Sequence, residues 1–180
     1  MNPQGATTFL IEFLFDVYIL LVLTRFILQA VRADFFNPIS QFIVRATNPP
    51  LAPLRRVIPG FKGMDMASLV LVLALLVLKI VVVLWLRGYA GPYDPAPLLL
   101  YGVRELASLL LSYAFWAILL RVILSWVAPD PGNPVVRIVT QITEPIMAPA
   151  RKLLPPMGGL DLSPILVLLL LQFLRILFQV

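Results

Sequence analysis

The chain has 180 residues, a formal net charge of +5 at neutral pH, and neither cysteine nor histidine. These absences exclude disulfides, thiol chemistry and imidazole ligation of zinc or haem. Apolar residues make up 61% of the sequence and gather in long runs, which is typical of a membrane protein. The sequence has no Walker loop, Rossmann glycine pattern, metal-ligand cluster or nucleic-acid-binding motif. We therefore expect no enzyme, no cofactor or metal, and no nucleic-acid partner.

Four apolar stretches are long enough to cross a bilayer, which takes about 20 helical residues. We expect membrane helices over roughly 9–31, 66–86, 98–127 and 162–180. The third stretch exceeds one crossing, so it either tilts or begins with an interfacial segment near 98–105. The first stretch has no basic region before it and carries Glu12 and Asp16, which favours a retained helix over a cleaved signal peptide.

The sequence contains an internal repeat. Residues 25–83 and 121–179 align without a gap, and 19 of the 59 aligned positions are identical. Since a repeat determines the architecture, we predict an all-α, polytopic membrane protein with four transmembrane helices. They form two tandem, parallel hairpin repeats, one over 1–88 and one over 98–180, each with short amphipathic interfacial helices in its loop.

Positive charge predicts the orientation of these hairpins. The loops within the two repeats hold Arg32, Arg45, Arg55, Arg56, Lys62, Arg137, Arg151 and Lys152. The connection between the repeats has only Arg87, at its edge. Because Lys and Arg favour the cytoplasmic side, we expect both repeat loops to be cytoplasmic and both termini periplasmic.

Each repeat loop begins with Asn-Pro, at Asn37-Pro38 and Asn133-Pro134, where Asn caps a helix and Pro suits its first turn. Helical spacing then gives each loop an apolar stripe that we expect to face the membrane. The stripes are Ile39, Phe42, Ile43 and Ala46 in the first copy, and Val135, Ile138, Val139 and Ile142 in the second.

Prolines next predict a break between two short helices in each loop, at Thr47-Asn48 and at Thr143-Glu144. The basic pairs that follow, Arg55-Arg56 and Arg151-Lys152, either anchor the loop to anionic lipid headgroups or form a binding surface for a partner. Asp65 and Asp161 are placed to cap the next membrane helix.

Charged residues inside membrane helices are costly and mark candidate sites. Lys79 and Arg175 are repeat equivalents in the outer half of the membrane, and depth predicts an ion pair between Lys79 and Asp16. Glu105 is the candidate partner of Arg175. That second pairing is weaker, because the repeat equivalent of Asp16 is Ser112.

Two interpretations of these charges remain open. They form structural ion pairs or extend outward to the interface, or they line a path for ions or protons. Arg25 and Arg121, near the cytoplasmic end, are explained by side chains that extend to the interface. Asp34 and Asp130 each precede Asn-Pro and indicate turns.

The assembled motif, N-P-x8-T-x-P-x3-P-x-R-[RK]-x-[IL]-P-x3-G-x-D, occurs twice and resembles that of the YggT family, also called YlmG. It covers Asn37, Pro38, Thr47, Pro49, Pro53, Arg55, Arg56, Pro59, Gly63 and Asp65. In the second copy it covers Asn133, Pro134, Thr143, Pro145, Pro149, Arg151, Lys152, Pro155, Gly159 and Asp161.

The resemblance implies a small bacterial inner-membrane protein without an agreed biochemical activity. Bacterial relatives are associated with osmotic-shock tolerance and potassium uptake, and chloroplast relatives with nucleoid distribution and cytochrome b6 assembly. We expect a non-enzymatic scaffold or assembly factor that acts through an unknown membrane partner or a homo-oligomer. The alternatives are an oligomeric ion channel or transport component, for potassium, and a lipid-binding protein that depends on the two basic pairs.

Overall fold

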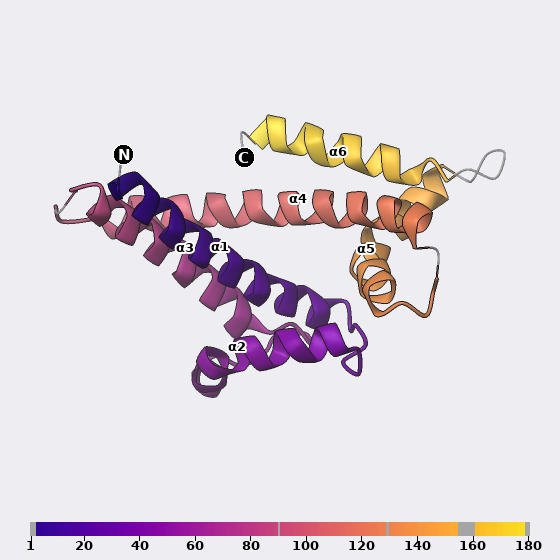
Figure 1. The fold of residues 1–180 in the computed structure, drawn as a ribbon, viewed down its shortest axis with the longest axis horizontal. Coiled ribbons are helices and arrows are strands. Elements are labelled where there is room, and N and C mark those ends of the chain that lie inside the picture. Colours follow the sequence, from indigo (N-terminus) through magenta and orange to yellow (C-terminus); the bar gives the residue numbers. More distant parts are fainter. Residues whose placement is uncertain (1–2, 90, 129, 155–160, 179–180) are drawn as a thin grey trace. The chain divides into compact units, whose positions relative to one another are not determined.

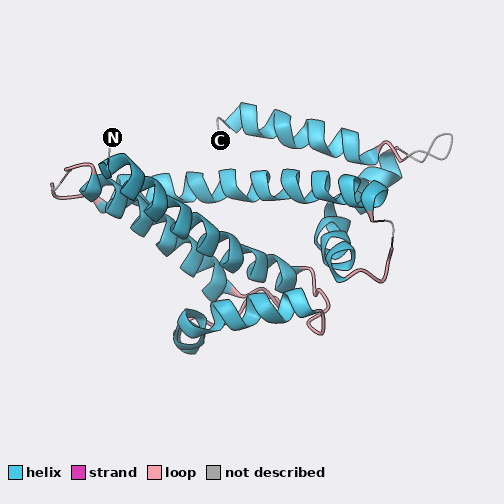
Figure 2. Cartoon of the chain, in the orientation of Figure 1, coloured by secondary structure: helices cyan, strands magenta, loops and turns pink. Residues whose placement is uncertain are grey.

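The computed structural model describes residues 3–89, 91–128, 130–154 and 161–178, and within these ranges the chain is helical (Figures 1 and 2). Its helices are α1 (Pro3–Ala30), α2 (Pro38–Val57), α3 (Met66–Leu86), α4 (Pro95–Val127), α5 (Pro134–Leu153) and α6 (Ser163–Phe178). Pro155 and Gly159 of the repeated motif lie outside the described residues.

Among the described residues, three helices are long and apolar enough to cross a membrane, at 5–30 in α1, 66–86 in α3 and 95–127 in α4. They coincide with the first three spans expected from the sequence, to within four residues at each end. The fourth expected span contains α6, an apolar helix of 16 residues. A fourth crossing therefore stays a prediction.

The chain divides into two compact units. Unit 1 comprises residues 1–30 and 43–106, and unit 2 comprises residues 31–42 and 107–180. The segment at 31–42 thus belongs with the second half of the chain. The repeat boundaries expected from the sequence remain a prediction.

In unit 1, α1 and α3 lie side by side (Figure 1). Their buried residues include Ile19 and Leu23 from α1, and Val72 and Leu76 from α3. The beginning of α4 approaches α3 at Gly102, where a Cβ atom would lie 2.8 Å from Val77 Cγ2. A larger residue would force the neighbouring side chains to move, so the absence of a side chain at Gly102 is what permits this close approach.

In unit 2, α6 packs against α5 and the second half of α4. The buried cluster takes Ile118 from α4, Met147 and Ala150 from α5, and Val167 and Leu171 from α6. The amphipathic helix α5 is therefore held by protein on its apolar face, and not by lipid alone.

The predicted break within each loop is wrong. Residues 38–57 and 134–153 each form one helix, with prolines inside. Pro50 has no N–H to donate to the Ala46 carbonyl, and the Tyr18 hydroxyl of α1 lies 3.5 Å from that oxygen. A neighbouring helix thus supplies a donor that the proline lacks, which helps α2 to continue past its prolines.

The apolar stripe predicted for the first loop is partly wrong. Ile43 is buried, but Phe42 is 62% exposed, and the buried face of α2 also takes Ser40, Thr47 and Leu51. In the second copy, Ile138, Val139 and Ile142 are buried within the protein, so this stripe does not face the membrane as expected. The expectation fails because α2 and α5 are bonded to the helices before them, which hydrophobicity alone cannot indicate.

Candidate functional site

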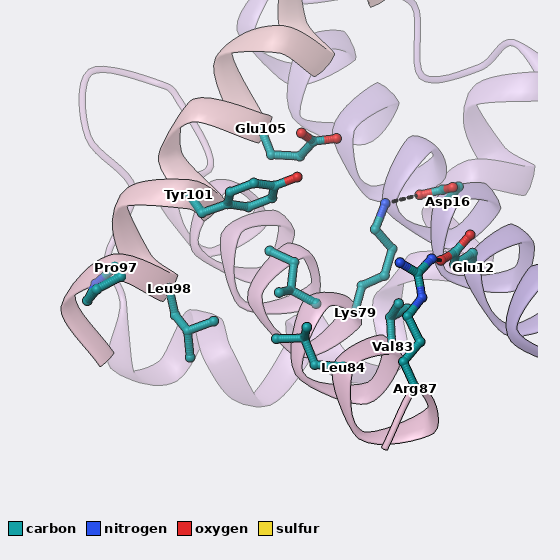
Figure 3. Close-up of a pocket in the computed structure, with 11 residues that line it drawn as sticks. Glu12, Asp16, Lys79, Val83, Leu84, Arg87, Pro97, Leu98, Tyr101 and Glu105 are labelled. Carbon is teal, nitrogen blue, oxygen red and sulfur yellow. Dashed lines mark hydrogen bonds and ion pairs between the residues drawn. The ribbon is translucent and has the colours of Figure 1, made fainter. Parts of the chain in front are cut away.

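A cavity of about 600 Å³ opens in unit 1 between α1, α3 and the first turns of α4 (Figure 3). Its size falls within the range of small-molecule sites, roughly 300–1,000 Å³. Apolar side chains such as Ile80, Leu84 and Leu98 form part of its wall. The charged residues that line it are Glu12, Asp16, Lys79, Arg87 and Glu105.

The ion pair predicted between Asp16 and Lys79 is present in this cavity. Lys79 Nζ donates to Asp16 Oδ1 at 2.6 Å, and the lysine side chain is only 17% exposed (Figure 3). A second pair was not predicted. Arg87, at the end of α3, donates to Glu12 Oε1 at 3.3 Å. The i, i+4 spacing of Glu12 and Asp16 places both acids on one face of α1, opposite Lys79 and Arg87.

Glu105 projects from α4 into the same space, beside Tyr101 (Figure 3). Within the described part of unit 1, its carboxylate has no ion-pair or hydrogen-bond partner. Arg175, its predicted partner, belongs to unit 2, where its Nε atom is buried and unpaired among the described residues. Their pairing therefore stays a prediction.

A second polar site lies at the other end of unit 1, where Arg25 of α1 meets α2. The Arg25 guanidinium donates to the Val44 carbonyl at 2.8 Å, to Thr47 Oγ1 at 3.0 Å and to Asn48 Oδ1 at 3.4 Å. Arg25 is only 5% exposed. The expectation that it extends to the interface is therefore wrong, because α2 folds back over it and supplies its acceptors.

The same arrangement recurs in unit 2 at the repeat-equivalent residues. Arg121 Nη1 donates to Thr143 Oγ1 at 2.9 Å and to Glu144 Oε2 at 3.1 Å. We call these two clusters the Arg–Thr anchors: Arg25 with Thr47, and Arg121 with Thr143. The arginine and the threonine are identical in the two copies of the repeat, but the sequence alone does not indicate that they bond to each other.

In the first basic pair, Arg55 forms an ion pair with Asp65 of the same loop. Its side chain contacts both carboxylate oxygens of Asp65, with Nε at 3.3 Å from Oδ1. Burial alone would raise the pKa of Asp65, but the hydrogen bonds from Arg55 and Ser68 and the Arg55 charge lower it below its ordinary value. Asp65 stands at the N-cap position of α3, as predicted. Its side chain, however, does not accept a hydrogen bond from the N–H groups of the helix, so the predicted side-chain cap is absent.

In the second basic pair, Arg151 bonds to Glu144 and not to Asp161. Burial opposes ionisation of Glu144, yet the hydrogen bonds and charges of Arg151 and Arg121 hold its pKa below the ordinary value. Asp161 accepts from the Ser163 N–H at 2.9 Å, as a residue that precedes a helix does. The second residue of each basic pair, Arg56 or Lys152, is exposed.

The Asn-Pro starts are confirmed. Asn37 and Asn133 accept from the N–H groups of Ile39 and Val135, each at 2.9 Å. Asn37 also donates to the Pro134 carbonyl at 2.8 Å, so the beginnings of the two loops join within unit 2.

The predicted turns at Asp34 and Asp130 are also present. Their Oδ1 atoms accept from the N–H two residues on, Phe36 at 2.9 Å and Gly132 at 2.8 Å. Asp34 has a further role that the sequence did not reveal, since its Oδ2 accepts from Arg137 at 2.8 Å. Within unit 2, the segment 31–42 is therefore linked to the first turns of α5.

The other motif residues have smaller roles. Gly63 adopts a φ of +84°, which favours glycine, in the turn before Asp65. Pro38 and Pro134 occupy the first helical position, and Pro49, Pro53, Pro145 and Pro149 lie inside the helices. Pro59 is exposed. Among the described residues, no group of three or more carboxylates is placed to hold a metal ion.

In the described part of the chain, three apolar helices of spanning length indicate a membrane protein. A model of the CCB3/YggT family matches residues 4–86 and 92–180. The chain belongs to the CCB3/YggT family.

Its relatives are similar along nearly their whole length. An uncharacterised protein of Pseudomonas aeruginosa is 50% identical over 172 residues, which cover 96% of this chain and 87% of the relative. A Vibrio alginolyticus protein encoded in the proC 3′ region is 43% identical, over 94% of this chain and 91% of its own. The YggT protein of Escherichia coli K12 is 34% identical, over 93% and 86%. No solved structure matches the chain significantly.

Proposed function

We propose that this protein is a non-enzymatic scaffold or assembly factor of the bacterial inner membrane that supports osmotic-stress tolerance and membrane homeostasis. Its four crossings form two parallel hairpins, with both repeat loops in the cytoplasm and both termini in the periplasm. An unidentified membrane protein, or a second copy of the chain, is its partner.

The Arg–Thr anchors are the observation that supports this proposal. In each copy, a guanidinium on a membrane helix bonds to the middle of the amphipathic helix that follows it. A charged hydrogen bond to a buried acceptor contributes about 1.5–3 kcal/mol. Each loop helix is thereby held in a fixed place on its own membrane helix, which suits a surface that positions a partner.

The cavity in unit 1 favours a second candidate, a channel or transport component for potassium. Charged side chains that line a cavity inside apolar helices are the kind of feature that ion pathways use. However, the ammonium group of Lys79 is occupied by Asp16, and the guanidinium of Arg87 contacts Glu12. Conduction would require these pairs to open, so the scaffold is the better-supported function.

Potassium flux separates the two functions. The full chain is reconstituted in liposomes under an osmotic gradient, beside Lys79→Ala, Arg175→Ala and the loop control Lys62→Ala. We expect flux no higher than in empty liposomes for all four proteins, provided that each is folded and inserted. If the Lys79 or Arg175 substitution alters the flux and Lys62→Ala leaves it unchanged, the result would contradict the scaffold function and support the channel.

Anionic lipid headgroups on the cytoplasmic side are the proposed lipid partners of both loops. Arg56 and Lys152 supply the contact, since Arg55 and Arg151 are engaged by carboxylates of the chain. Each surface charge adds about 1 kcal/mol to the attraction. The double variant Arg56→Gln, Lys152→Gln should therefore reduce the enrichment of spin-labelled phosphatidylglycerol around the protein, and high salt should have the same effect. Equal enrichment in the double variant and the parent would contradict this assignment.

A further inference from the structure

The cavity in unit 1 has an unbalanced set of charges. Two cations, Lys79 of α3 and Arg87 directly after it, face two acids of α1 and form the pairs Lys79–Asp16 and Arg87–Glu12. The fifth charged residue of the lining, Glu105, lies on α4 and has no partner in the described part of this unit. The lining therefore carries one carboxylate more than it carries cations.

An unmatched carboxylate within an apolar helix is energetically costly, and a cation that binds beside it removes that cost. Tyr101 lies next to Glu105 and presents both an aromatic ring and a hydroxyl to the same space (Figure 3). Ammonium groups bind favourably to carboxylates and to the faces of aromatic rings. This combination favours an organic ammonium group over an anion.

Arg87 adds a second recognition element. Its side chain is 60% exposed, and a single contact of 3.3 Å joins it to Glu12. A guanidinium has five N–H donors, so Arg87 retains donors for a phosphate oxygen. The apolar wall formed by Ile80, Leu84 and Leu98 suits the hydrocarbon next to such a headgroup.

We propose that this cavity binds the ammonium group of an ethanolamine-type ligand, with Glu105 as the carboxylate that receives it and Arg87 as the donor to the neighbouring phosphate. The membrane source of the ammonium group is a phosphatidylethanolamine headgroup. The soluble source is a free alkylammonium, which has no phosphate and would engage Glu105 alone. The pairing of Glu105 with Arg175 and this proposal exclude each other, so the experiment has to separate them.

The test uses the full chain in detergent with equimolar phosphatidylethanolamine and phosphatidylcholine, and counts retained lipids by native mass spectrometry. These lipids differ in the three methyl groups on nitrogen, which remove the N–H donors. A parallel titration measures free ethanolamine binding in phosphatidylcholine nanodiscs. The variants are Glu105→Gln, Arg175→Gln and the matched control Asp94→Asn. The control removes a carboxylate outside the cavity and retains the capacity to cap α4.

A preference for phosphatidylethanolamine that falls roughly tenfold in Glu105→Gln and persists in Asp94→Asn would support the proposal, with the lipid as source. Ethanolamine binding that Glu105→Gln alone abolishes would support the same site with a soluble source. Absence of both, or binding that Glu105→Gln does not alter, would overturn it. Binding that emerges only in Arg175→Gln would also overturn it, because Arg175 would then be the native partner of Glu105.

Discussion

Replacement of Arg25 by methionine is expected to lower the free energy of unfolding by about 3 kcal/mol. The substitution removes a buried cation that donates to Val44, Thr47 and Asn48, and methionine offers these acceptors no donor. Loss of one partner from a buried polar network costs about 1–3 kcal/mol for each unsatisfied group. Thermal unfolding in detergent measures the effect as a reduced Tm.

The matched control is Arg45→Met, since Arg45 is an exposed arginine on α2. It should change the Tm little, because exposed charges contribute about 0–1 kcal/mol. Arg121→Met should fall between the two, since Arg121 is only partly buried. If Arg25→Met unfolds at the same temperature as Arg45→Met, the Arg–Thr anchor of unit 1 does not hold α2 in place.

Asp65→Asn is expected to cost about 1–3 kcal/mol at neutral pH and to remove part of the acid sensitivity of the protein. The pKa of Asp65 is depressed in the folded state by Arg55 and Ser68. Its stabilising effect is therefore fully present above the unfolded pKa of about 3.9, and it is lost as the pH falls through the lower, folded pKa. The variant lacks the titrating group, so its stability should fall less steeply in this acid range.

Chemical denaturation between pH 2 and pH 7 measures this difference. Asp161→Asn is the control, because Asp161 is exposed and an Asn could also accept from the Ser163 N–H. A double-mutant cycle with Arg55→Ala then isolates the coupling between Arg55 and Asp65. A coupling energy near zero, or an acid slope unchanged by Asp65→Asn, would show that the contact contributes nothing to stability.

Local chemistry and depth in the membrane predicted much of the structure. The caps at Asn37 and Asn133 depend on neighbours in sequence, and the Asp16–Lys79 pair depends on helical rise, so both could be inferred. The Arg–Thr anchors could not, because they require α2 and α5 to fold back on the helices before them. On a single helix Arg25 has no visible partner, which predicts that its side chain extends to the interface.

The continuity of α2 and α5 shows a second limit. Proline disfavours helix in the preceding residue, which predicted a break at Thr47-Asn48. In the structure, Thr47 and Leu51 are buried on either side of that point, and Arg25 and Tyr18 donate to nearby carbonyls. Tertiary contacts therefore outweigh the local preference. Likewise, the cavity could not be inferred, because it depends on how closely α4 approaches α3 at Gly102.

The proposed topology can be tested most directly by cysteine labelling, because the natural chain has no cysteine. Single substitutions Arg56→Cys, Gly91→Cys and Gly132→Cys mark the first loop, the connection and the second loop. A membrane-impermeant maleimide applied to spheroplasts should label only Gly91→Cys, and the other two should react only after permeabilisation. Labelling of Arg56→Cys from outside, or opposite sides for Arg56→Cys and Gly132→Cys, would contradict two parallel hairpins with cytoplasmic loops.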